Sequence, residues 1–165
     1  MNDVVAIDVL QTAMILEQTG KQFYLKAAQT TEDVTGKEMF AVLANDESSH
    51  FELIKRQYQD LVGGKSWLKI IGSIPGLADL PDKLFPPEKQ VPNQIINKSS
   101  NAEDALLFGI NIEIRSYDLY RKSALESDDP VAKEFFEYLA SQESYHYDVL
   151  MIRYDFQYGP LAWYP

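Results

Sequence analysis

An internal repeat with an offset of 96 residues constrains the fold of this chain more than any other feature of its sequence. Segment 36–50, GKEMFAVLANDESSH, aligns with segment 132–146, AKEFFEYLASQESYH. The identical aligned pairs are Lys37/Lys133, Glu38/Glu134, Phe40/Phe136, Leu43/Leu139, Ala44/Ala140, Glu47/Glu143, Ser48/Ser144 and His50/His146, and the same offset relates Glu17 to Glu113, Tyr24 to Tyr120 and Ala28 to Ala124. Two copies of one unit predict a pseudo-two-fold axis, and a site shared by both copies should lie on it.

Apolar residues recur every three to four positions in four stretches, which is the period of an amphipathic α-helix. The residues with this spacing are Val5, Val9, Ala13, Leu16 and Phe23; Phe40, Leu43, Phe51, Ile54 and Tyr58; Leu106, Ile110, Tyr117 and Tyr120; and Phe136, Leu139, Leu150 and Tyr154. We therefore expect helices over about 3–30, 34–62, 101–126 and 130–156. Asp128 or Asp129, followed by Pro130, should start the fourth helix, and Gly63-Gly64 should end the second.

The connections between these helices favour one topology. Short turns make residues 3–62 and 101–156 two antiparallel hairpins, whereas residues 63–100 form a long connection that contains five prolines. A connection of this length can run the whole length of a bundle, and we expect it to let the third helix start at the same end as the first. The prediction is an all-α, single-domain protein over residues 1–165, a ferritin-like four-helix bundle with one long crossover.

Two segments outside the helices are apolar. The crossover begins with Trp67, Leu68, Ile70, Ile71 and Ile74. We expect a short helix there, lying over the bundle or in a dimer contact, in preference to a membrane anchor. The C-terminal tail, residues 157–165, is aromatic and interrupted by proline, so we expect a strap over the bundle or a subunit contact and not a fifth helix.

The chain has only two histidines, and each follows a glutamate by three positions: Glu47 precedes His50, and Glu143 precedes His146. Residues i and i+3 share a face of a helix, so each motif presents a carboxylate and an imidazole in one direction. Iron and manganese accept both ligand types. One such motif is weak evidence, but its occurrence at both histidines is not expected by chance; the alternative is a pair of surface histidines on charged helices.

Glu17 and Glu113 complete the set, because each lies 30 residues before the glutamate of a Glu-x-x-His motif. Equal spacing in both hairpins would place all six groups at one level of the bundle. Ferritin-like di-iron proteins use this ligand set: one Glu from each of two helices and Glu-x-x-His from each of the other two. Both glutamates have isoleucine neighbours in the sequence, so we expect burial, which costs several kcal/mol for an uncompensated carboxylate. Two divalent cations would balance the four carboxylates in charge.

Composition excludes several other classes of function. The absence of cysteine excludes disulfides, iron–sulfur clusters, thiolate zinc sites and a cysteine nucleophile. A net charge of −10 argues against nucleic acid or an anionic membrane as the main partner. The sequence begins without a basic segment, and no apolar run approaches the ~18 residues of a membrane span, so we expect a cytoplasmic protein.

These residues together resemble the rubrerythrin family of the ferritin-like superfamily, over all four helices. The resemblance implies that Glu47 and Glu143 bridge two irons, that Glu17 and Glu113 are terminal ligands, and that His50 and His146 bind one iron each. It also implies that Tyr24 and Tyr120, each seven residues after a terminal glutamate, hydrogen-bond a ligand carboxylate or donate to a bound oxygen species.

The sequence departs from rubrerythrins at two points. Ser116 stands where rubrerythrins carry an extra glutamate, and the cysteine-ligated rubredoxin domain is lacking. Small residues lie near the ligands, and Gly109 in particular indicates either access for a small molecule or close helix packing. Asp46, four residues before His50, is a weak candidate for orienting an imidazole, because its repeat mate is Gln142.

The leading hypothesis is a di-iron oxidoreductase, a peroxidase or ferroxidase that reacts an Fe(II) pair with O2 or H2O2. A peroxidase would need an external electron donor, and we expect a homodimer without nucleic acid or membrane partners. Manganese or zinc could replace iron, because carboxylate-rich sites accept all three. The alternatives are an iron storage or detoxification protein and a non-catalytic metal-binding module.

Overall fold

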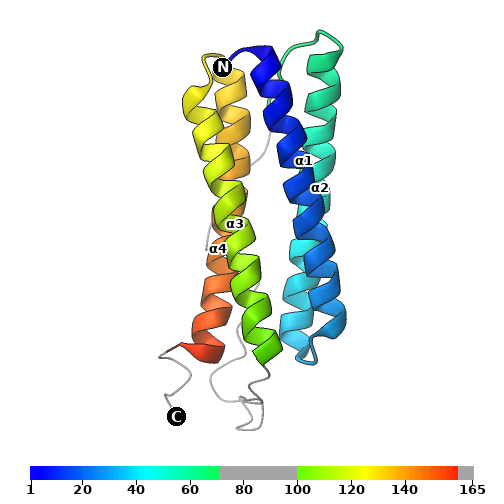
Figure 1. Ribbon diagram of the computed structural model, residues 1–165, viewed down its shortest axis with the longest axis vertical. Helices are drawn as coiled ribbons and strands as arrows, with labels where there is room; N and C mark the ends of the chain where they lie inside the picture. Colours follow the sequence, from blue (N-terminus) through cyan, green and yellow to red (C-terminus); the bar gives the residue numbers. More distant parts are fainter. Residues whose placement is uncertain (71–99, 160–165) are drawn as a thin grey trace.

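The computed structural model describes residues 1–70 and 100–159, and in them the chain forms four long helices (Figure 1). They are α1 (Asp3–Thr30), α2 (Val34–Val62), α3 (Ser100–Glu126) and α4 (Pro130–Tyr158). α1 packs along α2, α3 packs along α4, and α1 also contacts α3. The prediction of an all-α, ferritin-like four-helix bundle is confirmed.

Polar side chains and glycine determine where the helices begin and end. Asp33 accepts a hydrogen bond from the backbone of Gly36 at the start of α2, and Asp129 accepts two at the start of α4, with Pro130 in the first turn. The end of α2 is at Gly63, and the next residue, Gly64, has a φ of 71° that favours glycine. These ends agree with the predictions, whereas α4 continues to Tyr158, two residues further than expected.

The direction of α3 corrects one expectation. In Figure 1, α1 runs downwards from the N-terminus and α3 runs upwards, so the two helices start at opposite ends of the bundle. The ammonium group of Met1 accordingly contacts Asp128, 2.9 Å away, just beyond the end of α3. The expectation that the third helix starts at the same end as the first was wrong. Because α1 and α2 form a hairpin, α2 ends at the end of the bundle where α1 begins. A connection that then spans the bundle reaches the opposite end, where α3 begins.

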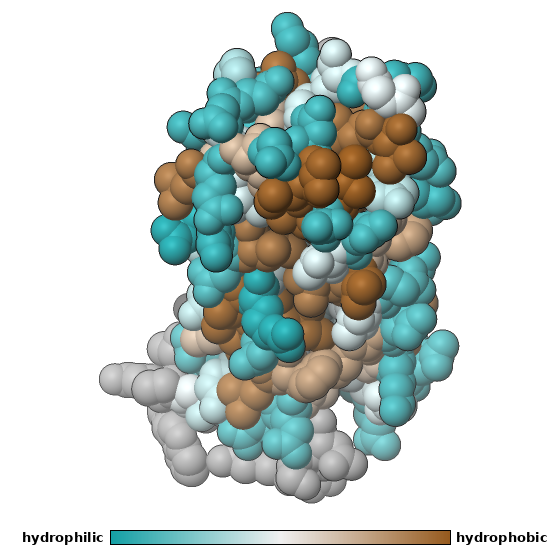
Figure 2. All heavy atoms as spheres, turned by 45° about the horizontal axis from the view of Figure 1, so that its top comes forward, coloured by the Kyte–Doolittle hydropathy of each residue, from teal (hydrophilic) through white to brown (hydrophobic). Residues whose placement is uncertain are grey.

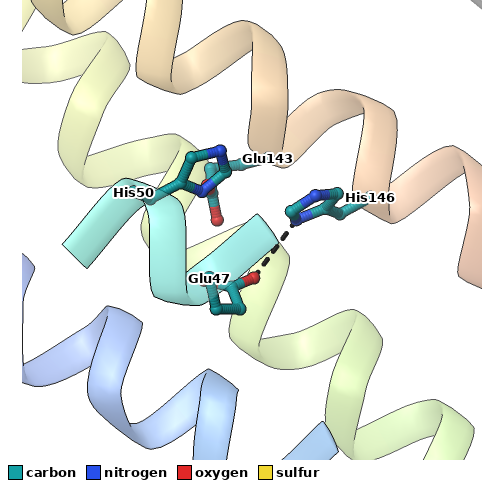
Figure 3. Close-up of side chains that lie close together, drawn as sticks. All are labelled: Glu47, His50, Glu143 and His146. Atoms are coloured by element: carbon teal, nitrogen blue, oxygen red, sulfur yellow. Dashed lines mark ion pairs between the residues drawn. The ribbon is translucent and has the colours of Figure 1, made fainter. Parts of the chain in front are cut away.

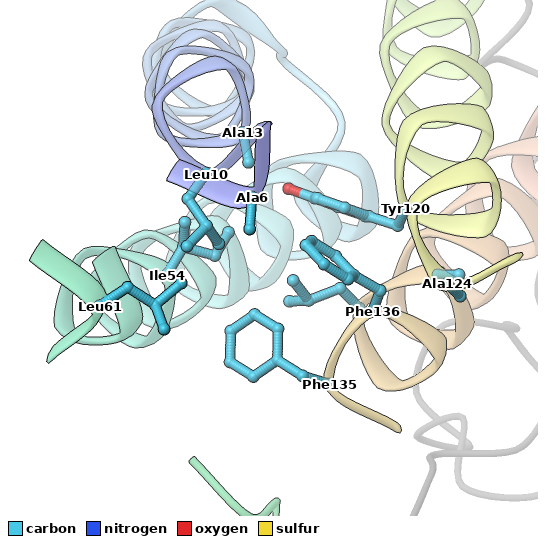
Figure 4. Packing of buried hydrophobic residues seen from close by; sticks show 11 residues of the cluster. Ala6, Leu10, Ala13, Ile54, Leu61, Tyr120, Ala124, Phe135 and Phe136 are labelled. Atoms are coloured by element: carbon cyan, nitrogen blue, oxygen red, sulfur yellow. The ribbon is translucent and has the colours of Figure 1, made fainter. Parts of the chain in front are cut away.

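The core consists of two apolar clusters, one towards each end of the bundle. The first cluster contains Ala6, Leu10, Ala13, Ile54, Leu61, Tyr120, Ala124, Phe135, Phe136, Leu139 and Ala140 (Figure 4). The second contains Tyr24, Ala27, Ala28, Met39, Phe40, Leu43, Ala44, Leu106, Ile110, Val149 and Leu150. On every helix the two sets are separated in sequence by a buried glutamate, so a polar layer lies between two apolar layers.

The described part of the crossover covers the first cluster. Trp67 and Ile70 pack against it, and the ring of Trp67 lies 5.4 Å from that of Phe136. Residues 65–70 are not helical, so the expected short helix does not begin there; Ile71 and Ile74, and the tail beyond residue 159, lie outside the described residues.

The outer surface combines charged residues with scattered apolar ones, which Figure 2 shows on one face. Exposed apolar side chains include Ile15 (67% exposed) on α1 and Ile114 (43%) on α3. Single apolar residues at a surface are common in folded proteins. None of the helices in the described part of the chain is long and apolar enough to span a lipid bilayer.

Candidate metal centre

The two Glu-x-x-His motifs meet at the middle of the bundle. Glu47 and His50 project from α2, and Glu143 and His146 project from α4 (Figure 3). All four residues are buried, and one potential ligand atom from each lies within 4.8 Å of the others. The spacing of three residues places both groups of each motif on the inner face of its helix, as the sequence predicts.

Glu17 of α1 and Glu113 of α3 join this group. His50 Nδ1 lies 3.4 Å from Glu17 Oε2 and 3.4 Å from Glu143 Oε1. His146 Nδ1 lies 3.5 Å from Glu113 Oε2 and 3.2 Å from Glu47 Oε1. Each contact has a counterpart at the 96-residue offset. The six predicted ligand residues are therefore brought together, in two groups related by the repeat.

Several side-chain oxygen and nitrogen atoms at this centre form no hydrogen bond. The buried side-chain atoms without a hydrogen-bond partner include Glu17 Oε2, Glu47 Oε1, Glu113 Oε2, both carboxylate oxygens of Glu143, His50 Nδ1 and His146 Nδ1. Buried polar atoms are normally paired, and an unpaired one costs free energy. Carboxylate oxygens and imidazole nitrogens without partners, gathered at one point, fit the donor set of two divalent metal ions.

The pKa values of the carboxyl groups reflect this crowding. Burial raises the pKa of Glu47 and of Glu143 well above 4.5, and the neighbouring carboxylates raise both further. Burial also acts to raise the pKa of Glu17, but its close contacts with Glu47, His50 and Tyr120 outweigh burial and lower the value. The centre can therefore hold negative charge only where a positive or hydrogen-bonding group faces it.

The histidines respond in the opposite sense. Burial acts to lower the pKa of His146, but the facing carboxylates, Glu113 first, outweigh burial and raise it well above 6.5. Contacts with Glu17 likewise outweigh burial and raise the pKa of His50. Without metal, the imidazoles are thus favoured as cations that partly neutralise the carboxylates. A metal ion would take over this role, since ligation requires a neutral imidazole.

Two tyrosines connect the hairpins at the glutamates. The Tyr24 hydroxyl of α1 donates to Glu113 of α3, and the Tyr120 hydroxyl of α3 donates to Glu17 of α1. Burial raises the pKa of both tyrosines well above 10, and nearby glutamates raise it further, so both remain protonated donors. The sequence predicts tyrosines that hydrogen-bond the carboxylates, but it does not show that each one reaches across to the other hairpin.

Asp46 contacts a different histidine from the one that its sequence position indicates. Its Oδ2 lies 3.5 Å from Nε2 of His146, across the interface between α2 and α4. Asp46 and His50 are one helical turn apart, and the side chain of Asp46 points to the facing helix instead. Sequence spacing within one helix cannot identify a contact of this kind.

Glycines allow close approach near the centre. A Cβ atom on Gly20 would lie 3.3 Å from Cδ of Glu47, a constraint that the sequence reasoning missed. A Cβ atom on Gly109 would lie 3.2 Å from Cε1 of Tyr24 and 3.3 Å from Leu150, which supports the close-packing explanation for this glycine. Gly20 aligns with Ser116 in the repeat. A glycine within a helix where the other copy has a side chain was the sequence signal for this close approach.

Comparisons with known proteins agree with this architecture. A hypothetical protein from Pyrococcus furiosus has a similar structure, with a TM-score of 0.69 and 23% sequence identity over 96% of this chain and 92% of that one. This similarity supports the fold alone. A search among curated proteins finds no match. The family model for rubrerythrin matches residues 8–153, which include all four helices and all six residues of the centre. The chain therefore belongs to the rubrerythrin family.

Proposed function

We propose that this protein is a di-iron carboxylate oxidoreductase whose Fe(II) pair reacts with O2 or H2O2. The observation that carries the proposal is the set of buried, unpartnered oxygen and nitrogen atoms at the middle of the bundle. Four carboxylates in a dry core are stable only with compensating charge, and two divalent cations supply it. Membership of the rubrerythrin family favours iron as the metal.

The contacts between the side chains support two metal positions. Glu17 and His50 would hold one ion, and Glu113 and His146 would hold the other. Glu47 and Glu143 each lie beside the histidine of the opposite hairpin, as expected of carboxylates that bridge two ions. Iron bound there would supply electron transfer and the activation of oxygen.

The remaining residues of the centre prepare it for this chemistry. Tyr24 and Tyr120 orient the terminal glutamates and hold a proton at each hydroxyl oxygen. The apolar clusters on either side keep bulk water away from the polar layer. Exclusion of water strengthens each electrostatic contact, because the local dielectric constant falls.

Anaerobic addition of Fe(II) followed by separate mixing with O2 and with H2O2 tests the proposal. We expect uptake of two Fe(II) per chain and growth of near-ultraviolet ferric absorption with at least one oxidant. His146→Ala should bind less iron, whereas Glu134→Gln, an exposed change on the same helix, should behave as the parent protein. Two bound Fe(II) that give no absorption change with either oxidant would instead indicate a non-catalytic metal-binding module.

The same experiment distinguishes storage from oxidoreductase activity. A storage protein would continue to take up iron beyond two ions per chain and would assemble into a large shell. The mass in solution, measured by light scattering, tests the proposed homodimer against that assembly.

A further inference from the structure

The repeat makes the two halves of the metal centre alike in every predicted ligand, but not in the residue that directly precedes the glutamate of each Glu-x-x-His motif. Asp46 of the first hairpin corresponds to Gln142 of the second. Two other differences close to the centre, Gly20/Ser116 and Ala13/Gly109, involve uncharged residues. Asp46 and Gln142 therefore introduce a difference in charge into a centre that is otherwise symmetric.

Asp46 is placed to act on His146. The Nδ1 atom of His146 faces the carboxylates of the centre, and its Nε2 atom lies 3.5 Å from Asp46 Oδ2. His146 Nε2 has no hydrogen-bond partner, so Asp46 acts on it as a nearby charge. A carboxylate at this distance favours the proton on Nε2, which leaves Nδ1 with a free lone pair directed inwards. It also makes Nδ1 a stronger donor to a metal ion.

Gln142 is the repeat mate of Asp46, so the pseudo-two-fold symmetry predicts that it lies on the side of His50. It lies on α4 four residues before His146, as Asp46 lies on α2 four residues before His50. Gln142 is buried, and its Nε2 atom has no hydrogen-bond partner, so its amide nitrogen is not engaged elsewhere. In the described part of the chain, His50 contacts carboxylates only through Nδ1. An amide at this place can orient the imidazole but adds no negative charge.

We propose that the two metal positions are unequal, because Asp46 positions and strengthens His146 while Gln142 leaves His50 the weaker donor. The position formed by His146 and Glu113 then fills first. The inference rests on the metal centre of the proposed function but not on its reaction with an oxidant.

The expected inequality is moderate. Loss of a group that orients a metal-binding histidine typically weakens metal affinity by about 10- to 100-fold. The side chain of Asp46 is 35% exposed, so water screens part of its charge. We therefore expect a difference of about tenfold between the two positions, at the lower end of that range.

Zn(II) titration of metal-free protein, followed by NMR of the histidine rings, tests the inference without any redox chemistry. The chain has only two histidines, so long-range 1H–15N spectra contain two ring systems, which a His50→Gln variant assigns. We expect Nδ1 of His146 to change its chemical shift at substoichiometric Zn(II), ahead of His50. Isothermal calorimetry should resolve two affinities about tenfold apart.

The repeat itself supplies the matched variants. Asp46→Gln should make both rings respond together and weaken the tighter position about tenfold, and Gln142→Asp should bring the weaker position up to the tighter one. The double variant D46Q/Q142D keeps the composition unchanged and should make His50 respond first. Glu52→Gln, an exposed change on α2, should leave the order as it is. Circular dichroism checks that each variant is folded.

The outcomes separate the two proposals. Two rings that respond together in the parent protein, or an order that D46Q/Q142D does not reverse, would overturn the inequality and leave the metal centre standing. If neither ring responds to Zn(II), the metal centre and the inequality both fail.

Discussion

The metal-free protein should become less stable as the pH rises from about 5 to about 6.5, because the pKa values of Glu47 and Glu143 are raised on folding. The folded state then retains protons that the unfolded chain has already released. The pKa of Glu17 is lowered, so its contribution is complete above 4.5 and is lost only in stronger acid. The pKa values of His50 and His146 are raised, so their contributions are complete below 6.5.

The magnitude follows from the linkage between protonation and folding. Each carboxyl group whose pKa is raised lowers the free energy of unfolding by about 1.4 kcal/mol per pH unit, between its unfolded and folded pKa values. Two such groups give a slope of up to about 2.8 kcal/mol per pH unit while both stay protonated in the folded state. Glu143→Gln removes one group and also relieves Glu47 of a neighbouring charge, so the slope should fall by half or more.

Urea unfolding of chelator-treated protein, followed by far-ultraviolet circular dichroism at several pH values in this window, measures the slope directly. Glu134→Gln, exposed on the same helix as Glu143, should leave the slope unchanged. Protein loaded with Zn(II) should show the opposite trend, since metal binding is stronger when protons are fewer. A metal-free protein whose stability is constant or rises across the window would refute this account, as would an unchanged slope in Glu143→Gln.

Three further substitutions have defined expectations. Tyr24→Phe leaves an oxygen of Glu113 unpartnered and should lower metal affinity about tenfold in a Zn(II) competition assay, with the fold retained by circular dichroism. Asp33→Ala removes both the cap of α2 and the ion-pair partner of the largely buried Arg153. It should lower the free energy of unfolding, measured in urea, by about 2–3 kcal/mol. Arg153→Met, which leaves no buried charge, should lower it less. Gly109→Ala forces a methyl group against Tyr24, and should lower the stability by about 1 kcal/mol net of the better helix propensity of alanine; a higher melting temperature would contradict the close packing.

The repeat made most of the centre predictable. Residues at matching positions in two copies are related by the symmetry axis, and those that face the interior between the copies meet near it. Glu17, Glu113 and the two Glu-x-x-His motifs could therefore be grouped without any contact information. The same helices bring all six groups together in the structure.

The burial of the glutamates was predicted correctly, but for a reason that the structure does not support. Ile15 and Ile114, apolar residues close to Glu17 and Glu113 in sequence, are both exposed, and only Ile112, on the other side of Glu113, is buried. Residues one or two positions apart on a helix point in different directions, so they do not report on each other's burial. The buried face of α1 is instead Ala6, Leu10, Ala13, Glu17, Gly20, Tyr24, Ala27 and Ala28.

That face of α1 is rotated by about one residue from the predicted one, Val5, Val9, Ala13, Leu16 and Phe23. Small and charged residues make up much of it, so a count of large apolar residues finds the wrong face. Side-chain contacts between different helices could not be predicted from the sequence either. The pairing of Asp46 with His146 depends on how α2 faces α4, which no spacing along one helix determines.

The crossed tyrosine contacts have a consequence for how the molecule is put together. Tyr24 of one hairpin reaches Glu113 of the other, and Tyr120 returns the same contact to Glu17. Exchange of identical contacts in both directions is the rule of an isologous interface between two subunits, realised here within a single chain. Neither hairpin holds all six residues of the candidate metal centre. If the chain is cut within the crossover, the two fragments should still associate, and bound metal should hold them together.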